Sequence, residues 1–453
     1  MSSSTQLSRS ARPDLAIAQA HEYMHGAARG SAAISVGFFA LSVFSFACGV
    51  LTLPFVVPRA AEFFYQAVPL AITHLFTLGW ITAAIMGVMY RYVPALTRSP
   101  LRSRKLAWIQ LGLYFTGASG MVMHFAIGIW PGLWLAAMVV VLSILIFAWN
   151  ILPCLTDQFG RGVAETGMFL SVCFLIAAAL LGTLLGLDKS YDFLGGSLLT
   201  NLAAHVHLAA VGWVTLSICA VSYRMLPAFL LPAVNLPASA KWQLYALAAA
   251  VSGLAIALLL GSAIASMFAI AIALTMAWYV AIIMRMVGAR RMPLNWTPMH
   301  AMAGLVSLAI ALASGVALSF VGGDSVIGAR LAPAYAVMGL LGFFSNFIIG
   351  MSYQLFPGIV ARARTETGSP PVTIAEISVA KPRLLVFATF NGGVLALAIG
   401  FLAGSVDLSL IGSLLVAFGG SVYAATTMWT LSYAVRRSIP RAAQESPLRI
   451  LPG

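Results

Sequence analysis

The sequence predicts an all-α integral membrane protein with twelve transmembrane helices in three pseudo-symmetric arcs of four. Three observations carry this prediction. Of the 453 residues, 61% are hydrophobic and only 8% are charged, whereas soluble domains carry about 25% charged residues. The apolar residues fall into runs long enough to cross a hydrocarbon layer of about 30 Å. One helical segment also recurs three times along the chain, which indicates an internal repeat.

The predicted spans follow from the apolar runs, at a rise of about 1.5 Å per helical residue. They lie near residues 33–57, 67–93, 106–127, 132–155, 166–187, 197–226, 242–262, 264–288, 299–321, 331–356, 383–405 and 409–435. Together they form a membrane domain of residues 32–441, between an N-terminal lead (1–31) and a C-terminal tail (442–453). We expect no soluble domain.

The basic residues support this count and orient the chain. With twelve spans, 22 of the 25 Lys and Arg residues lie on one side, and only Arg59, Lys189 and Arg330 lie on the other. Short cytoplasmic loops carry an excess of Lys and Arg, so both termini are predicted to lie in the cytoplasm, as in a multi-pass protein of the bacterial inner membrane. The net charge of +13 therefore reflects topology in the lipid bilayer and not nucleic-acid binding.

The repeated segment gives the internal organisation. HLFTLGWITAAIMGVMYRYVPAL begins at His74, and HLAAVGWVTLSICAVSYRMLPAF begins at His207, 133 residues later and without a gap. A weaker copy over 337–357 has valine in place of the histidine. Each copy is the second of four spans in repeats of about 33–155, 166–288 and 299–435. Parallel repeats predict a symmetry axis along the membrane normal, with functional sites between repeats.

Three histidines, His74, His205 and His207, lie about a third of the way into the predicted spans from the outer face. An ionisable side chain at that depth is costly and marks a functional site by default. A neutral imidazole is also a common ligand of metal ions and of haem iron. The alternative is a histidine that only hydrogen-bonds to a neighbouring helix. His124, near the outer end of its span, is a further candidate metal ligand or an interfacial residue.

The spacing of His205 and His207 limits what they bind. Residues i and i+2 of an α-helix are about 200° apart around its axis. The two imidazoles are therefore predicted to face opposite sides of one helix, and either of them could pair with His74 across a flat macrocycle. Gly79 and Gly212 follow the repeated histidines by about a turn, where glycine lets a ring approach the backbone or lets helices pack closely.

The remaining histidines and the cysteines are expected to have no catalytic role. His21 and His25 lie in the polar lead, and His300 lies at the inner end of its span, so we predict solvated or interfacial positions for them. The four cysteines are scattered through apolar runs without a CxxC pair, which is typical of buried free thiols.

This arrangement resembles subunit I of the haem-copper oxidase superfamily. The shared features are twelve spans in three arcs, a histidine in the outer half of the second span and a His-x-His on an inward-running span. The stretch AHVHLAAVGWVTL is most similar to the cbb-type oxidase and nitric oxide reductase branch, and a divergent, NnrS-like member fits best. The resemblance implies haem b, with His74 and either His207 or His205 as axial iron ligands. It places Arg59 or Arg330 near the haem propionates.

The departures from that family limit the function that carries over. The family holds its His-x-His on the tenth span, where this chain has Val337 at the repeat position. The family also has a His-His pair for copper on the seventh span, where residues 242–262 contain no histidine. No Asp, Glu or Lys lies in the middle of a span. We therefore predict that the usual copper site and the carboxylates of a proton path are absent.

Three kinds of function stay open. The first is a haem protein for electron transfer in the membrane or for the response to nitric oxide or redox stress. Its partner would be a cytochrome c, a quinol or another respiratory subunit, and as an enzyme it would be an oxidoreductase. The second is a transporter or handling protein for copper or another metal. The third is a structural subunit of a respiratory complex, whose histidines only bridge helices.

Overall fold

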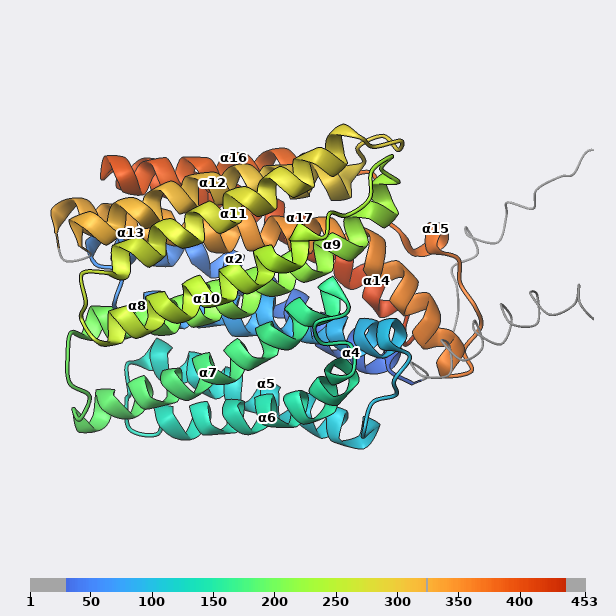
Figure 1. Ribbon diagram of the computed structural model, residues 1–453, viewed down its shortest axis with the longest axis horizontal. Coiled ribbons are helices and arrows are strands. Elements are labelled where there is room, and N and C mark those ends of the chain that lie inside the picture. Colours follow the sequence, from blue (N-terminus) through green and yellow to red (C-terminus); the bar gives the residue numbers. More distant parts are fainter. Residues whose placement is uncertain (1–29, 323–324, 437–453) are drawn as a thin grey trace, which may run out of the picture.

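Membrane-length helices make up nearly all of the structure. The computed structural model describes residues 30–322 and 325–436, and within them twelve helices are long and apolar enough to cross a membrane (Figure 1). The helices lie side by side in one bundle, which confirms the predicted all-α fold with twelve spans. Most of the predicted lead (1–31) and all of the predicted tail (442–453) fall outside the described residues.

The helices follow the three predicted repeats. The first repeat contains α2 (Ala32–Glu62), α3 (Ala67–His74), η1 (Leu75–Thr82), α4 (Ala83–Thr97), α5 (Arg104–Ile127) and α6 (Leu133–Thr156). The second contains α7 (Val163–Tyr191), α8 (Leu198–His207), η2 (Leu208–Thr215), α9 (Leu216–Leu230), α10 (Ser239–Leu259) and α11 (Ala265–Gly288). The third contains α12 (Trp296–Val321), α13 (Val326–Val337), η3 (Met338–Ser345), α14 (Asn346–Glu366), the short α15 (Ile374–Ile377), α16 (Arg383–Ala403) and α17 (Val406–Ser432).

Side-chain and glycine caps set the ends of several spans. The Ser103 hydroxyl accepts a hydrogen bond from the backbone N–H of Leu106 and starts α5. Gly128 ends α5 at φ = 67°, a left-handed conformation that glycine adopts without a Cβ clash. The turn between α16 and α17 uses the same two devices, with Gly404 at φ = 68° and the Ser405 hydroxyl. These caps satisfy backbone groups that lipid cannot satisfy.

The repeats close into a ring through their first and last helices. α6 packs along α7, α11 packs along α12, and α17 packs along α2. Each junction therefore joins the last helix of one repeat to the first helix of the next. The second span of each repeat is more deeply buried than the third and fourth spans of that repeat. These three inner spans form the centre of the bundle.

Each inner span changes helix type at the same place. An eight-residue π-helix begins directly after the position of the repeated histidine: η1 after His74, η2 after His207 and η3 after Val337. A π-helix closes i→i+5 hydrogen bonds, so it inserts a residue into the turn and rotates the side chains beyond it. Such segments are rare and often mark functional sites. The apolar pattern of the sequence gives no sign of them.

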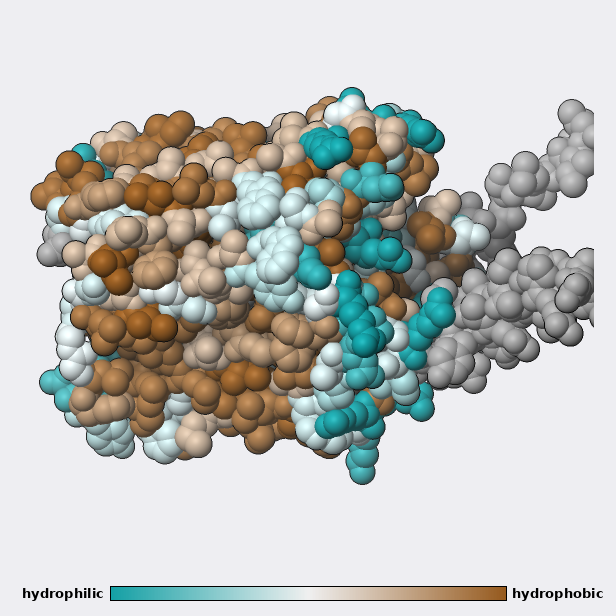
Figure 2. All heavy atoms as spheres, in the orientation of Figure 1, coloured by the Kyte–Doolittle hydropathy of each residue, from teal (hydrophilic) through white to brown (hydrophobic). Residues whose placement is uncertain are grey.

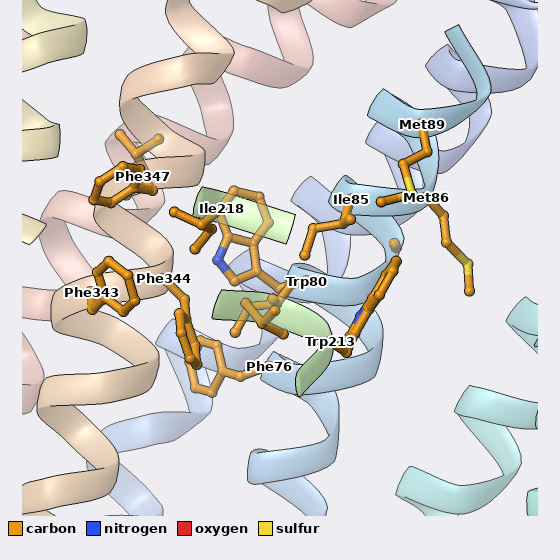
Figure 3. Packing of buried hydrophobic residues seen from close by; sticks show 14 of the residues in the cluster. Phe76, Trp80, Ile85, Met86, Met89, Trp213, Ile218, Phe343, Phe344 and Phe347 are labelled. Atoms are coloured by element: carbon orange, nitrogen blue, oxygen red, sulfur yellow. The ribbon is translucent and has the colours of Figure 1, made fainter. Parts of the chain in front are cut away.

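Two indoles join the inner spans to one another. Trp213 Nε1 donates to Thr82 Oγ1 at 3.1 Å, from the second repeat to the first. Trp80 Nε1 donates to Ser345 Oγ at 3.0 Å, from the first repeat to the third. Figure 3 shows both rings at the centre together with Phe343, which stands at the equivalent position of the third repeat. Phenylalanine has no hydrogen-bond donor. The hydrogen bond from an indole to a hydroxyl of another inner span therefore occurs at two junctions and is lost at the third.

Hydrophilic residues gather at one end of the bundle, where α4, α9 and α14 finish (Figures 1 and 2). We call this the basic end, because Arg98 caps α4 and Arg362 lies in the last two turns of α14. Arg59 and Lys189 lie near the C-terminal ends of α2 and α7, at the opposite end. Between the two ends the face seen in Figure 2 is mostly hydrophobic, as a lipid-facing surface requires.

Replacing Trp213 with phenylalanine tests the central hydrogen bonds. Trp213→Phe leaves the buried Thr82 hydroxyl without its donor, and we expect it to lower the free energy of unfolding by about 1 kcal/mol or more. Unfolding of the purified protein in detergent, followed by circular dichroism, measures the change. Trp242→Phe is the control, because Trp242 is 63% exposed. Equal stability of the two variants would show that the indole bond contributes nothing.

Candidate functional site

His74 is the last residue of α3 and the N-cap of η1. Its Nδ1 atom lies 2.8 Å from the carbonyl oxygen of Leu70, one helical turn earlier. Its ring stacks on Phe125 of α5, with the centroids 4.5 Å apart and the planes at 21°. These two contacts fix the orientation of the imidazole without any further ligand.

His205, on α8, faces the first helix of its own repeat. Its Nδ1 lies 2.9 Å from the carbonyl oxygen of Ala178 on α7. Gly182, one turn further along α7, makes room for the ring, because a Cβ built there would lie 2.6 Å from His205 Cε1. These contacts place the His205 ring against α7.

His207 faces the other side of the same helix. Its Nδ1 lies 2.7 Å from the carbonyl oxygen of Ala203, and its Nε2 lies 3.3 Å from the hydroxyl of Tyr335 on α13. The His207 and Tyr335 rings are nearly parallel, at 22°. The opposite orientation that the spacing predicts is thus found: His205 turns towards α7 of its own repeat and His207 towards the third repeat.

Two positions in each repeat line the junctions. The N-caps of the π-helices are His74, His207 and Val337. The residues two positions before them are Ile72, His205 and Tyr335. The structure brings His207 against Tyr335, and His74 and His205 hold the equivalent two positions of the first and second repeats. The equivalent positions at the third junction are Val337 and Ile72, which carry no ligand atom. The triplication has therefore produced one His/His pair, one His/Tyr pair and one aliphatic pair.

The three imidazoles are arranged to act as ligands through Nε2. A carbonyl oxygen only accepts hydrogen bonds, so Nδ1 of His74, His205 and His207 carries the proton and Nε2 keeps the lone pair. The same backbone contact orients ligating histidines in metal sites. Within the described residues, Nε2 of His74 and Nε2 of His205 have no hydrogen-bond partner. In the same part of the chain, no group of three or more His, Cys, Asp or Glu is arranged to hold a metal ion.

A cation stands beside this junction at the end opposite the basic end. Lys189 of α7 places its ammonium nitrogen 4.5 Å from the ring centroid of Tyr65 and 4.5 Å from that of Trp130. Trp130 meets Phe125 edge-on at 6.0 Å, and Phe125 is the ring that stacks on the first imidazole. Sequence reasoning missed Lys189 because its surroundings come from three separate segments.

Packing also sets the ionisation state of Tyr65 at this end of the bundle. Burial, and then the Asp188 carboxylate, raise the pKa of Tyr65 to about 12, so the phenol stays neutral beside the ammonium. The two arginines predicted to meet the propionates lie in other places. Arg330 packs on the turn at Gly404, where a Cβ would lie 2.9 Å from its Cζ. Arg59 is exposed in the last turn of α2.

The other candidate histidines are held by local contacts. His124 Nδ1 lies 3.0 Å from the carbonyl oxygen of Ile129, so its ring belongs to the turn between α5 and α6. The sequence predicts a solvated or interfacial His300, and the structure corrects this: the residue is fully buried, with Nδ1 2.7 Å from Asn346 Oδ1 and the ring against Phe387. Its place at the end of an apolar run does not reveal that α14 and α16 cover it. His21 and His25 lie outside the described residues.

The repeated glycines serve helix packing. A Cβ built at Gly79 would lie 2.6 Å from the Ser45 Cβ on α2, and one at Gly212 would lie 2.6 Å from the Phe174 ring on α7. Gly342 packs in the same way on α12. Each inner span thus contacts the first helix of its own repeat through this glycine. Of the two roles that the sequence allows for Gly79 and Gly212, the contacts support close packing.

No model of a known protein family and no curated protein sequence matches the chain. Among solved structures, the chain is similar to a haem-copper terminal oxidase determined as a dimer by cryo-EM, with a TM-score of 0.61 over 88% of this chain and 84% of that one. The fold is that of a haem-copper terminal oxidase chain. The sequence identity is 16%, so the likeness concerns the fold alone.

Substituting Gly79 separates the two roles of the repeated glycine. Gly79→Ala places a methyl group against Ser45, and we expect it to lower the stability of the cofactor-free protein by about 1–3 kcal/mol. Gly112→Ala is the control, because a Cβ there meets nothing within 4 Å. Thermal unfolding of both variants measures the effect. If the Gly79→Ala protein is as stable as the control, Gly79 is not needed for helix packing. The other role, which is to let a flat ring approach the backbone, would then be favoured.

Proposed function

We propose that this chain is a membrane haem protein that holds one haem b between its first and second repeats, with His74 and His205 as axial ligands. Electron transfer within the membrane is its role. In a bacterial inner membrane the basic end would face the cytoplasm, because short cytoplasmic loops carry the excess of Lys and Arg. The histidine pair would then lie nearer the outer face.

The orientation of the two imidazoles supports this proposal. They come from different repeats, each is fixed through Nδ1 by a backbone carbonyl, and each keeps its Nε2 lone pair. Imidazole is the commonest biological ligand for haem iron of this kind. His207 is the weaker partner for His74, because its Nε2 already contacts Tyr335 on the opposite side of the helix. The likeness of the fold to a haem-copper terminal oxidase is consistent with a haem cofactor.

The surroundings of the pair suit a rigid redox site. His74 and His205 would hold the haem, which would supply one-electron chemistry. Phe125 limits rotation of the His74 ring, and Gly182 gives the His205 ring a fixed place on α7. Imidazoles that are fixed in this way would move little when the haem gains or loses an electron. A cytochrome c, a quinol or another respiratory subunit would be the electron donor. A more specific form of this proposal is a role in the response to nitric oxide or redox stress.

Lys189 is the basic residue that we assign to a haem propionate, in place of Arg59 or Arg330. Its ammonium is held at the same junction by Tyr65 and Trp130, at the end of the ring stack that leads to His74. A cation surrounded by neutral rings in a low-dielectric region attracts a carboxylate strongly.

Alanine variants of the three histidines test the assignment. We expect the purified protein to show the Soret and sharp α bands of a six-coordinate b-type haem. His74→Ala and His205→Ala should each remove this spectrum or most of the bound haem, because each takes away one axial ligand. His207→Ala should keep it, because this imidazole faces the other junction. Oxidised and reduced optical spectra, with haem quantified per chain, measure the outcome.

His124→Ala is the matched control, since the His124 ring contacts the turn after α5 and lies outside the pair. Loss of the spectrum in His207→Ala but not in His205→Ala would contradict the assignment. Stoichiometric copper without haem in the purified protein would contradict the function itself and favour metal handling. Unchanged cofactor content in all four variants would favour the structural role.

A further inference from the structure

The second junction, between the second and third repeats, contains a hydrogen bond between two side chains. Nδ1 of His207 lies 2.7 Å from the carbonyl oxygen of Ala203, so Nδ1 carries the proton and Nε2 carries the lone pair. The hydroxyl of Tyr335 lies 3.3 Å from this Nε2 and is therefore the donor. The lone pair with which His207 would bind a metal is thus already used by the tyrosine.

Tyr335 stands where the second repeat has His205. Each of them lies two residues before the N-cap of the π-helix of its repeat. Each also rests on a glycine in the first helix of its own repeat. A Cβ built at Gly315 of α12 would lie 3.2 Å from the Tyr335 ring, and one at Gly182 of α7 would lie 2.6 Å from the His205 ring. The two repeats therefore build the same place for a ring and fill it with different side chains.

The first junction has a histidine at both of the corresponding positions. His74 is the N-cap of η1, and His205 is the residue two positions before the N-cap of η2. In the described part of the chain, Nε2 of each has no hydrogen-bond partner. The second junction has His207 and Tyr335 at these positions, and the two are bonded to each other. One imidazole has become a phenol, and the imidazole that is left donates no lone pair to a cofactor.

We propose that Tyr335 limits this chain to one haem, by taking the place of a second axial histidine and by occupying the lone pair of His207. This inference rests on the proposed function, because it takes His74 and His205 as the ligands of the one haem. Direct contact between the hydroxyl and Nε2 leaves no gap for a flat macrocycle between them. The hydroxyl also supplies the donor that a partly buried imidazole acceptor needs.

The third junction supports the same reading. Its two positions are held by Val337 and Ile72, and neither side chain has an atom that can bind a metal. Aliphatic side chains therefore remove the possible ligands at the third junction, and a hydrogen bond occupies the possible ligand at the second. Only the first junction keeps two imidazoles whose Nε2 atoms are free of hydrogen bonds within the described residues.

Tyr335→His tests the proposal on the full-length protein, expressed with ample haem. The variant gives the second junction the two imidazoles that the first one has, so we expect haem per chain to rise from one towards two. Adding His207→Ala to this variant should return the count to one, because the new site loses a ligand. Haem extracted from the purified protein, together with iron quantified per chain, measures the change.

Ile72→His is the matched control. It places the same imidazole at the equivalent position of the first repeat, where the facing residue is Val337 and not a histidine. We expect this variant to hold one haem per chain, as the natural protein does. A rise in haem content as large as that of Tyr335→His would show that any added histidine recruits haem, and it would overturn the role of the His207–Tyr335 pair.

Tyr335→Phe gives a measurement that does not depend on haem, and it covers the case in which Tyr335→His does not fold. It removes only the hydroxyl, so the lone pair of His207 becomes free. Diethylpyrocarbonate should then modify His207 several-fold faster than in the natural protein, as mapped by mass spectrometry. Tyr114→Phe is the control, because the hydroxyl of Tyr114 donates to the carbonyl of Leu78. Equal modification of His207 in both variants would contradict the proposed bond.

The haem counts separate this inference from the proposed function. A natural protein without haem overturns the proposed function and this inference with it. If the natural protein holds one haem and a folded Tyr335→His protein also holds one, only the inference is overturned. Two haems in the natural protein would overturn it as well, because the second junction would then bind a cofactor in the presence of the tyrosine.

Discussion

The change from α- to π-helix within each inner span is the constraint on which the rest of the structure depends. Above it, the helix presents the positions of His74, His207 and Val337 to the junctions between repeats. Below it, the glycines pack on the first helix of their own repeats, and the indoles join the inner spans at the centre of the bundle. Hydroxyl groups span the wide turn in two repeats: Thr215 donates to the carbonyl of Ala210 at 2.9 Å, and Ser345 donates to that of Leu340 at 2.8 Å. Each of these bonds reaches back five residues, which is the period of the π-helix itself.

One sequence pattern, used three times, has been altered at each junction in a different way. The helix type, the packing glycine and the ring of contacts are kept in all three repeats. The side chains that face the junctions are free to differ, and they give a His/His pair, a His/Tyr pair and an aliphatic pair. At the basic end two repeats keep a tyrosine–glutamine pair, and in the third repeat Arg383 lies over the ring of Tyr353. The three repeats share one scaffold, but the residues at their junctions differ. This explains how a fold with threefold pseudo-symmetry carries sites that do not occur three times.

The spans, the repeats and the directions of the two paired histidines could be predicted from the sequence, because each depends on a pattern within a short stretch of the chain. Span number follows from apolar runs, repeat boundaries follow from the copied segment, and the opposed directions of His205 and His207 follow from helix geometry. The π-helices could not be predicted, because an inserted backbone turn leaves the apolar pattern almost unchanged. The burial of His300, the packing role of Gly79 and the aromatic surroundings of Lys189 depend on helices distant in sequence.

The central claim is our proposal that His74 and His205 hold one haem between the first and second repeats. Electron paramagnetic resonance of the oxidised, purified protein, combined with iron quantified per chain, tests this most directly. The account predicts one low-spin ferric centre per chain with the anisotropy of two imidazole ligands. A high-spin signal, or a purified and folded chain that holds no haem iron after expression with ample haem, would contradict it.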